Sequence, residues 1–231
     1  MEDTDIMSGS TNAVRVLAWS ELTEPKDVYP KGISGALADF LNTQEGITAA
    51  TACLDDPDQG VSESTLAQTD VLIWFGHMRH RDVSDETVAR VVRHVKERGM
   101  GFLPIHSSHF ARPLQALTGT SCAWRTYVED GKSAFIKVMM PQHPIAEGVA
   151  DFTIPKEEWY GEPFQIPIPE AVVFAGLYND GQELARDGIC FTIGQGRVFY
   201  FRPGHETYPI YNMPEVRRII RNAVMWLAKR T

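Results

Sequence analysis

The sequence is poor in cysteine, and its few cysteines lie far apart. Cys53, Cys122 and Cys190 are the only three among 231 residues, and they form no CxxC pair. An odd and widely spaced set argues against a disulfide framework and against a structural zinc knuckle. We therefore expect each of them to be a small buried side chain, as free cysteines usually are.

Long apolar runs and basic clusters are also missing. No run approaches the roughly 18 apolar residues that a transmembrane helix needs, so we expect no membrane association. The 22 basic residues are outnumbered by 30 acidic ones, which gives a formal net charge of −8. Nucleic acids and anionic membranes both select basic patches, so neither is an expected partner.

Nucleotide-binding loops are absent as well. No P-loop occurs, and Gly194-Gln195-Gly196 is not followed by a helical pattern, so it indicates a hairpin and no nucleotide cofactor. Residues 1–13 are acidic and polar and lack the basic and apolar regions of a signal peptide. We interpret them as a disordered leader before a single domain over residues 14–231, and we expect a cytoplasmic protein.

The rest of the sequence alternates apolar runs with helical patterns. Such an alternation predicts an α/β fold with a doubly wound, mostly parallel sheet and helices on both faces. The apolar runs are typical of strands that are covered on both sides. The expected strands are 14–19, 46–52, 71–76 and 102–105, and the expected helices are 32–42, 62–67, 84–99 and 108–117.

After residue 119 this rhythm changes. We expect strands at 133–139 and 172–177, an antiparallel hairpin over 188–201 and a final helix over 214–229. Residues 151–170 are rich in proline, acids and aromatics, and we interpret them as a long irregular loop. Loops of this length in compact domains are usually lids or walls of a functional site.

Three of the expected strands run directly into a histidine, namely His77, His106 and His205. Open α/β sheets bind their ligands outside the carboxyl ends of the strands. If the three strands are neighbours, the three imidazoles converge at one edge of the sheet. Such a cluster suits either a divalent metal, zinc or manganese, with these histidines as ligands, or a general acid/base pair.

The natural source of a carboxylate is the segment Glu158-Trp159-Tyr160-Gly161-Glu162. We expect His106 and Glu158 to be catalytic as acid and base. Trp159, Tyr160 and Glu162 suit a sugar, because aromatic rings stack on its C–H faces while its hydroxyls need polar partners. An alternative is that Trp159 and Tyr160 only anchor the loop to the core.

Two serines follow His106, which prompts a comparison with serine hydrolases. The G-x-S-x-G elbow is absent, because the sequence reads Pro104-Ile105-His106-Ser107-Ser108-His109, and no cysteine follows this strand. Nucleophilic acyl transfer is therefore disfavoured. The serines are interpreted as a helix N-cap, or for Ser107 as a hydroxyl donor to a ligand. His109 is a further catalytic candidate.

Four motifs stand out together: WFGH at 74–77, the stretch 99–110, EWYGEPF at 158–164 and YFRPGHETYP at 200–209. Together they resemble the ThuA-like trehalose-utilisation family, a branch of the class I glutamine-amidotransferase-like superfamily. The resemblance implies a flavodoxin-like sheet. It also implies that His106 stands near the position of the amidotransferase nucleophilic cysteine, so glutaminase activity is not implied.

The family is associated with the catabolism of trehalose and related disaccharides, beside oxidoreductases that produce 3-keto sugars. The leading hypothesis is therefore an enzyme that acts on a disaccharide or keto-sugar by proton transfer, with His77 and His205 as metal ligands or as donors to the carbonyl oxygen. Within the last motif we expect Arg202, Glu206 and Tyr208 to bind the substrate. A non-catalytic sugar-binding or sensing protein and an amidotransferase-like hydrolase are the alternatives. A homo-oligomer is compatible with the sequence.

Overall fold

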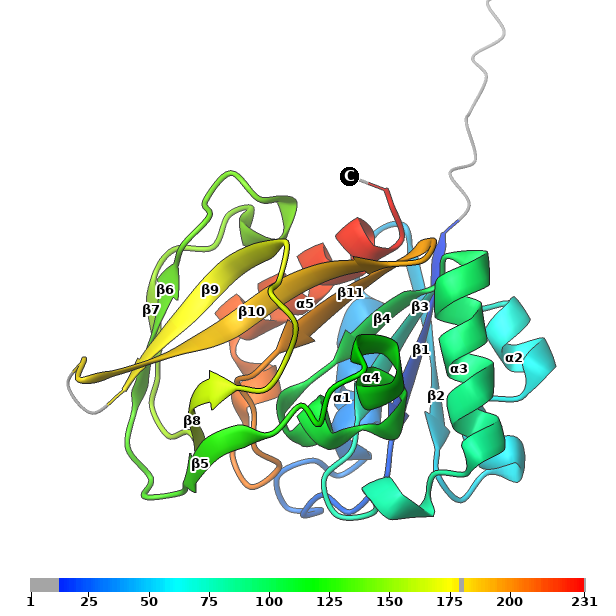
Figure 1. Cartoon of the computed structure of the whole chain (residues 1–231), viewed down its shortest axis with the longest axis horizontal. Helices are drawn as coiled ribbons and strands as arrows, with labels where there is room; N and C mark the ends of the chain where they lie inside the picture. Colours follow the sequence, from blue (N-terminus) through cyan, green and yellow to red (C-terminus); the bar gives the residue numbers. More distant parts are fainter. Residues whose placement is uncertain (1–12, 179–180, 231) are drawn as a thin grey trace, which may run out of the picture.

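The computed structural model describes residues 13–178 and 181–230, which are organised around a nine-stranded sheet (Figure 1). Five neighbouring strands are parallel, in the spatial order β2-β1-β3-β4-β11. This is the flavodoxin-type order, in which the chain begins inside the sheet and winds outward in both directions. The bounds are Val14–Ser20 for β1, Ile47–Cys53 for β2, Val71–Phe75 for β3, Gly101–Pro104 for β4 and Gly196–Phe201 for β11.

Beyond β11 the sheet continues with antiparallel strands. They are β10 (Glu183–Ile193), β9 (Ala171–Tyr178), β6 (Ala134–Val138) and β7 (Phe152–Ile154). A separate pair, β5 (Trp124–Val128) with β8 (Trp159–Phe164), lies below them (Figure 1). The predicted flavodoxin-like α/β fold is confirmed, and its antiparallel part is larger than the single hairpin that we expected.

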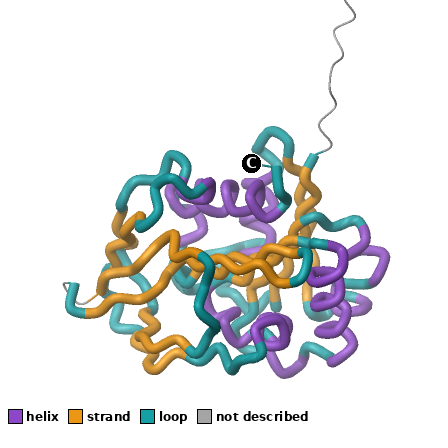
Figure 2. The backbone as a smooth tube through the Cα atoms, turned by 45° about the horizontal axis from the view of Figure 1, so that its top comes forward, coloured by secondary structure: helices purple, strands orange, loops and turns teal. Residues whose placement is uncertain are grey.

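Helices cover both faces of the parallel strands. Helices α1 (Gly32–Leu41) and α5 (Pro214–Leu227) pack on one face, and α3 (Asp85–Arg98) lies with α4 (Arg112–Thr118) on the other. The short α2 (Glu63–Ala67) packs beside α3. Figure 2 shows the strands as a layer between the two groups of helices. Strands β3 and β4 are buried along their whole length, as strands covered on both faces must be.

Two predictions about local structure are wrong. The helix expected over 108–117 is divided into a 3₁₀ turn, His106–Phe110, and α4, with Ala111 extended between them. The cause is Pro113, which has no N–H and whose ring excludes the carbonyl four residues earlier, so a helix cannot run through it. The loop expected over 151–170 contains β7 and β8, whose short, proline-containing sequences hide the strand pattern.

None of the described helices combines the length and the apolar character needed to cross a bilayer. The leader expected over residues 1–13 lies, apart from Ala13, outside the described residues. The core between the helical layers is aromatic at its centre, where the rings of Trp19 and Trp74 stack with centroids 3.7 Å apart.

We predict that Leu72→Ala lowers the free energy of unfolding by about 2–5 kcal/mol, because it removes a fully buried side chain from the centre of β3 and leaves a cavity. Urea denaturation followed by far-UV circular dichroism measures the change. Leu184→Ala in β10, where the side chain is 52% exposed, is the matched control and should shift stability by about 0.5 kcal/mol or less. If both substitutions lowered the free energy of unfolding equally, the burial of Leu72 and the exposure of Leu184 would be contradicted.

Candidate functional site at the carboxyl edge of the sheet

The three strand-end histidines lie close together. His77 follows β3, His106 follows β4 and His205 follows β11, and these strands are direct neighbours in the sheet. The ring centroid of His77 is 6.5 Å from that of His106 and 5.4 Å from that of His205, and the last two are 5.5 Å apart. The topology therefore brings the three imidazoles to one edge, as parallel neighbours do with their carboxyl ends.

His106 is held in an unusual backbone conformation. Its φ is +49°, in the left-handed region that residues other than glycine rarely adopt, whereas the preceding Ile105 is extended. Such a residue costs on the order of 1–3 kcal/mol and persists only where its surroundings fix it. Tyr200 contributes by donating its hydroxyl hydrogen to the carbonyl oxygen of His106, at 2.8 Å. A sharp turn of this kind lifts a side chain above the end of a strand, as in a nucleophile elbow.

The His106 ring has a defined tautomer. Its Nδ1 lies 3.0 Å from the carbonyl oxygen of Arg202, which can only accept a hydrogen bond, so Nδ1 carries the proton. In the neutral ring Nε2 is then an acceptor. It faces the Tyr160 hydroxyl at 2.9 Å and Oε2 of Glu158 at 3.1 Å, and these two oxygens are themselves 2.9 Å apart.

The three contacts in this triangle of His106, Glu158 and Tyr160 need a second proton besides that of the hydroxyl group. The Tyr160 hydroxyl supplies a single hydrogen, so an unprotonated Nε2 and an ionised carboxylate would face each other with lone pairs. Burial lowers the pKa of His106 well below its usual value, and burial also raises the pKa of Glu158. Of the two groups, these directions favour the carboxyl group of Glu158 over the imidazole as the holder of an extra proton, with Nε2 of His106 as its acceptor.

His205 also turns its Nε2 toward the carboxyl group of Glu158, but in the other tautomer. The backbone N–H of Thr207 donates to His205 Nδ1 at 3.2 Å, which places the proton of the neutral ring on Nε2. That Nε2 lies 3.6 Å from Oε2 of Glu158 and 3.9 Å from Oε1 of Glu129. His205 thus aims an N–H donor at the space beside Glu158.

The third histidine, His77, is paired with Glu206. Its Nδ1 contacts Oε1 of Glu206, and the other oxygen of that carboxylate lies 3.8 Å from Nδ1 of His205. Burial alone would lower the pKa of His77, but the Glu206 contact outweighs it and raises that pKa. Likewise, burial would raise the pKa of Glu206, and the His77 contact lowers it. Each group thus favours the charged form of the other.

The histidines and nearby carboxylates form two groups that could each hold a metal ion. Two sets of donor atoms lie within 4.8 Å of one another: His77, His205 and Glu206 form one set, and His106, Glu158 and His205 form the other. Each set contains two histidines and one carboxylate, a donor combination that zinc accepts. The three histidines expected as ligands are therefore divided between two sets that share His205.

A buried charge network supports the floor of the site. The guanidinium of Arg202 is fully buried and forms a two-pronged ion pair with Asp187, while its Nη1 donates to the carbonyl oxygen of Glu158 at 3.1 Å. Glu157 accepts the backbone N–H of Gly204 at 3.1 Å, and burial raises the pKa of Glu157 to about 8. Arg202 therefore positions the Glu158 main chain and has no exposed surface for a ligand.

A second buried carboxylate, Glu21, shapes the segment that carries His77. Its Oε2 accepts the consecutive backbone N–H groups of His77, Met78 and Arg79 at 2.8–3.0 Å. Three such bonds to one carboxylate fix the turn after β3 more tightly than neutral partners would. Glu21 directly follows β1 and so comes from the same edge of the sheet as the histidines.

Several residues expected to bind a sugar are bound to other groups of the protein. Trp159 is fully buried, where it stacks on Tyr178 and donates to Glu183 at 3.1 Å. Glu162 pairs with Arg186 at 2.8 Å. Ser107 donates to the carbonyl oxygen of Gly76 at 2.7 Å, which ties β4 to β3. These contacts assign the side chains to the framework around the site.

His109 contacts the triangle at Tyr160, whereas Tyr208 contacts His205. His109 is buried and donates from Nδ1 to the carbonyl oxygen of Cys122 at 2.8 Å, and burial lowers its pKa to about 3. It packs against Tyr160 and, within the described residues, forms no hydrogen bond with Glu158. Tyr208 is half-buried at the rim, where its hydroxyl donates to Glu129 at 3.3 Å.

Comparison with protein families gives the evolutionary context of this site. The model of the family described as trehalose utilisation, ThuA, matches residues 15–227. The chain belongs to the ThuA family. This confirms the resemblance carried by the four sequence motifs. No curated protein matches the chain.

Solved structures similar to this ThuA-family chain share its fold at low sequence identity. A ThuA-like protein from Bacteroides uniformis is 15% identical, with a TM-score of 0.65 over 93% of this chain and 91% of its own. A cytoplasmic protein from Salmonella typhimurium is 13% identical, with a TM-score of 0.66 over 93% and 99% of the two chains. A glutamine amidotransferase from Thermotoga maritima is 13% identical, with a TM-score of 0.59 over 94% and 98%.

Sequence reasoning missed Glu21, Glu129 and Asp187. Glu21 carries a usable signal, because it stands directly after an apolar strand that ends at the same sheet edge. Asp187 lies inside β10, where a buried acid requires a cationic partner, and Arg202 is that partner. Glu129 follows β5, a strand that we did not predict from the sequence, and the residues around it form no motif that indicates a functional site.

We predict that Glu162→Gln destabilises the protein at neutral pH and that the loss fades in acid. Burial would raise the pKa of Glu162, but the Arg186 contact outweighs it and lowers that pKa. The carboxylate therefore contributes stability above its unfolded pKa of roughly 4.3, and that contribution is lost as the pH falls through the lower folded pKa.

Urea denaturation at a series of pH values measures this difference. At pH 7 it should be about 1–2 kcal/mol, the contribution of a few hydrogen bonds to a charged group. Glu45→Gln, which changes an exposed glutamate, is the matched control and should show no such pH dependence. A destabilisation by Glu162→Gln that stays constant down to pH 2 would contradict the ion-pair origin.

Proposed function

We propose that this protein is an enzyme that moves a proton on a carbonyl-bearing sugar, such as a keto-disaccharide of the trehalose type. The observation that carries this proposal is the triangle of His106, Glu158 and Tyr160, whose contacts of 2.9–3.1 Å allow a proton to pass between Nε2 and a carboxyl oxygen. Membership of the trehalose-utilisation family supports the choice of substrate class. A cytoplasmic location is also part of the proposal, supported by the similar protein from Salmonella typhimurium, which is described as cytoplasmic.

Exposure separates the roles of Glu158 and His106. The side chain of His106 is 0% exposed, whereas those of Glu158 and His77 are 14% and 23% exposed. Glu158 is thus the group that meets the substrate, and His106 lies behind it as the partner that takes or returns its proton. A carboxyl group with such a partner can act as an acid in one step and as a base in the next.

His205 supplies the complementary donor. Removing a proton from the carbon beside a carbonyl group leaves negative charge on the carbonyl oxygen, and an N–H aimed at that oxygen stabilises it. The Nε2–H of His205 and the acidic Oε2 of Glu158 lie 3.6 Å apart, so the two can reach neighbouring atoms of one substrate. Isomerisation, enolisation and lyase-type cleavage all begin with this step.

The amidotransferase-like hydrolase is disfavoured by the side chains near the elbow. His106 occupies the turn itself, and the hydroxyls of Ser107 and Ser108 donate to backbone carbonyl oxygens of Gly76 and Trp74 at 2.7 and 2.8 Å. In the part of the chain that the structure describes, neither serine is hydrogen-bonded to a histidine side chain. Burial raises the pKa of Cys122, so that thiol is no activated nucleophile either.

The acid/base role is tested by hydrogen exchange. We predict that the protein incubated with 3-ketotrehalose in D₂O exchanges the C–H next to the carbonyl group, seen as loss of its proton NMR signal. Glu158→Gln keeps the shape but removes the titratable oxygen, and should slow the exchange by roughly 10²–10⁴-fold. His106→Asn should slow it by a similar factor, because the proton loses its second site.

The matched control is Glu45→Gln, which changes an exposed glutamate outside the site and should leave the rate within about threefold. Trehalose itself has no carbonyl group and should not exchange. Binding of the keto-sugar without any exchange would contradict the proposal and favour the non-catalytic sugar-binding protein. Full activity in a folded Glu158→Gln variant would remove Glu158 from the reaction.

We further propose that the histidine cluster binds a divalent cation. The set His77, His205 and Glu206 fits one, since its donor atoms lie within 4.8 Å of each other and tetrahedral zinc places its ligand atoms roughly 3.5 Å apart. The contact between His77 and Glu206 holds two of these groups in place, and a bound cation would take the place of the imidazolium proton. A cation here would stabilise negative charge on a substrate oxygen.

Metal analysis of purified protein, after equilibration with zinc or manganese and removal of excess, tests this part. We predict near-stoichiometric metal that is lost in the variant His77→Ala/His205→Ala. His143→Asn, a histidine change at a distant turn that keeps a hydrogen-bond acceptor for Ile145, is the control and should retain the metal. Metal below one tenth of stoichiometry in the unaltered protein would contradict the cation site and leave the proton-transfer proposal in place.

A further inference from the structure

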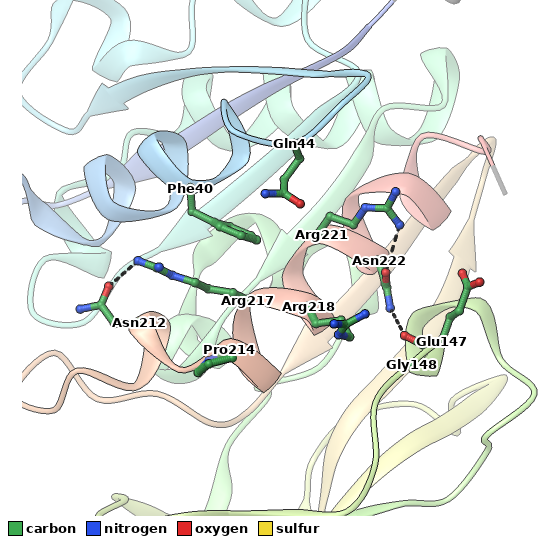
Figure 3. A pocket seen from close by; sticks show the side chains of 10 residues that line it. All are labelled: Phe40, Gln44, Glu147, Gly148, Asn212, Pro214, Arg217, Arg218, Arg221 and Asn222. Atoms are coloured by element: carbon green, nitrogen blue, oxygen red, sulfur yellow. Dashed lines mark hydrogen bonds between the residues drawn. The ribbon is translucent and has the colours of Figure 1, made fainter.

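A second concave site lies away from the histidines, between α1, α5 and the turn near Glu147. The pocket has a volume of about 720 Å³, in the range of small-molecule sites, and shares no lining residue with the histidine cluster. Figure 3 shows three arginines from one stretch of α5 on its wall. Arg217, Arg218 and Arg221 face Phe40 and Gln44 of the α1 side across the hollow.

The positive charge of this pocket is not neutralised by the protein. Within residues 13–178 and 181–230, none of the three guanidinium groups has a carboxylate at ion-pair distance. One acid, the exposed Glu147, also lines the pocket, so its lining carries three cations against one anion. The whole chain has a net charge of −8, which makes a local excess of positive charge a departure from the general surface.

The arginines are fixed by contacts that leave N–H groups free. Arg217 donates from Nε to the carbonyl oxygen of Tyr211 at 3.1 Å and from Nη2 to Asn212 at 2.8 Å, and its guanidinium lies 5.3 Å from the centre of the Phe40 ring. Arg221 donates to Asn222 at 3.3 Å. A guanidinium has five N–H donors, so Arg217 and Arg221, which line the pocket, each have donors beyond those used in these bonds.

The turn at Glu147 and Gly148 forms another wall of the pocket, where the backbone lies close to Arg218. The side-chain amide of Asn222 donates to the carbonyl oxygens of Ile145 and Glu147, at 3.2 and 2.8 Å, and so ties the turn to α5 (Figure 3). Gly148 in that turn has a φ of +67°, and a Cβ there would lie 2.9 Å from Nη1 of Arg218. The positive φ favours glycine here, and the guanidinium of Arg218 lies directly against this backbone.

We propose that this pocket binds a phosphate monoester of a small polyhydroxy compound. Planar guanidinium groups bind phosphate through paired N–H donors, and three of them around one hollow suit a doubly charged group. The volume exceeds what a phosphate group alone fills, and the amides of Gln44 and Asn212 offer partners to hydroxyl groups of the attached body. This site is independent of the function proposed for the histidines.

Isothermal titration calorimetry tests the proposal with glucose 6-phosphate, inorganic phosphate, glucose and malonate. We expect glucose 6-phosphate to bind more tightly than inorganic phosphate, and both more tightly than malonate. Binding should weaken at least tenfold in the variant Arg218→Ala/Arg221→Ala. This variant leaves Arg217 in place because Arg217 also holds the segment at Tyr211. Glucose lacks the phosphate, so any heat it gives should not respond to the arginine substitutions.

The control is Arg125→Ala, which removes an exposed arginine outside the pocket and should change affinity less than twofold. Arg218→Glu, at an exposed side chain, is a second variant that should abolish binding without affecting the fold. No binding of either phosphate compound at 10 mM (roughly the weak limit of a specific site), or full binding by Arg218→Glu, would overturn the proposal. Tighter binding of malonate than of phosphate would overturn the phosphate assignment.

Discussion

The conformation of His106 is the constraint on which the rest of the site depends. A left-handed residue at the end of β4 lifts the imidazole out of the sheet edge, and the surrounding chain must hold it there. The carbonyl oxygen of Arg202 holds the ring at Nδ1, and the Tyr200 hydroxyl holds its backbone. One geometry therefore fixes both where the ring lies and which of its nitrogens accepts a proton.

That geometry depends in turn on buried charge. Arg202 and Asp187 are both fully buried, so each is stable only in the presence of the other, and removing one would leave an uncompensated charge. Arg202 also donates to the main chain of Glu158, which connects the floor of the site to the carboxyl group of the triangle. The antiparallel strands therefore help to build the site, since β10 supplies Asp187 and β8 follows directly on Glu158.

The parallel half of the fold and the convergence of the histidines could be predicted from the sequence, because both follow from strand periodicity and from residues that end apolar runs. The roles of Trp159, Glu162 and Arg202 could not, because the same residue types serve as sugar ligands or as buried anchors. Only their partners, Glu183, Arg186 and Asp187, decide between the two. Pro163 concealed β8, the strand that carries Trp159 and Glu162.

The most direct test of this account is the tautomer of His106, measured by long-range ¹H–¹⁵N correlation NMR on ¹⁵N-labelled protein, with His106→Asn used to assign the signal. The account predicts a neutral ring at pH 7 with the proton on Nδ1 and an unprotonated Nε2 that accepts a hydrogen bond. A ring protonated on Nε2, or on both nitrogens, would contradict it, because Nε2 could then not accept a proton from Glu158.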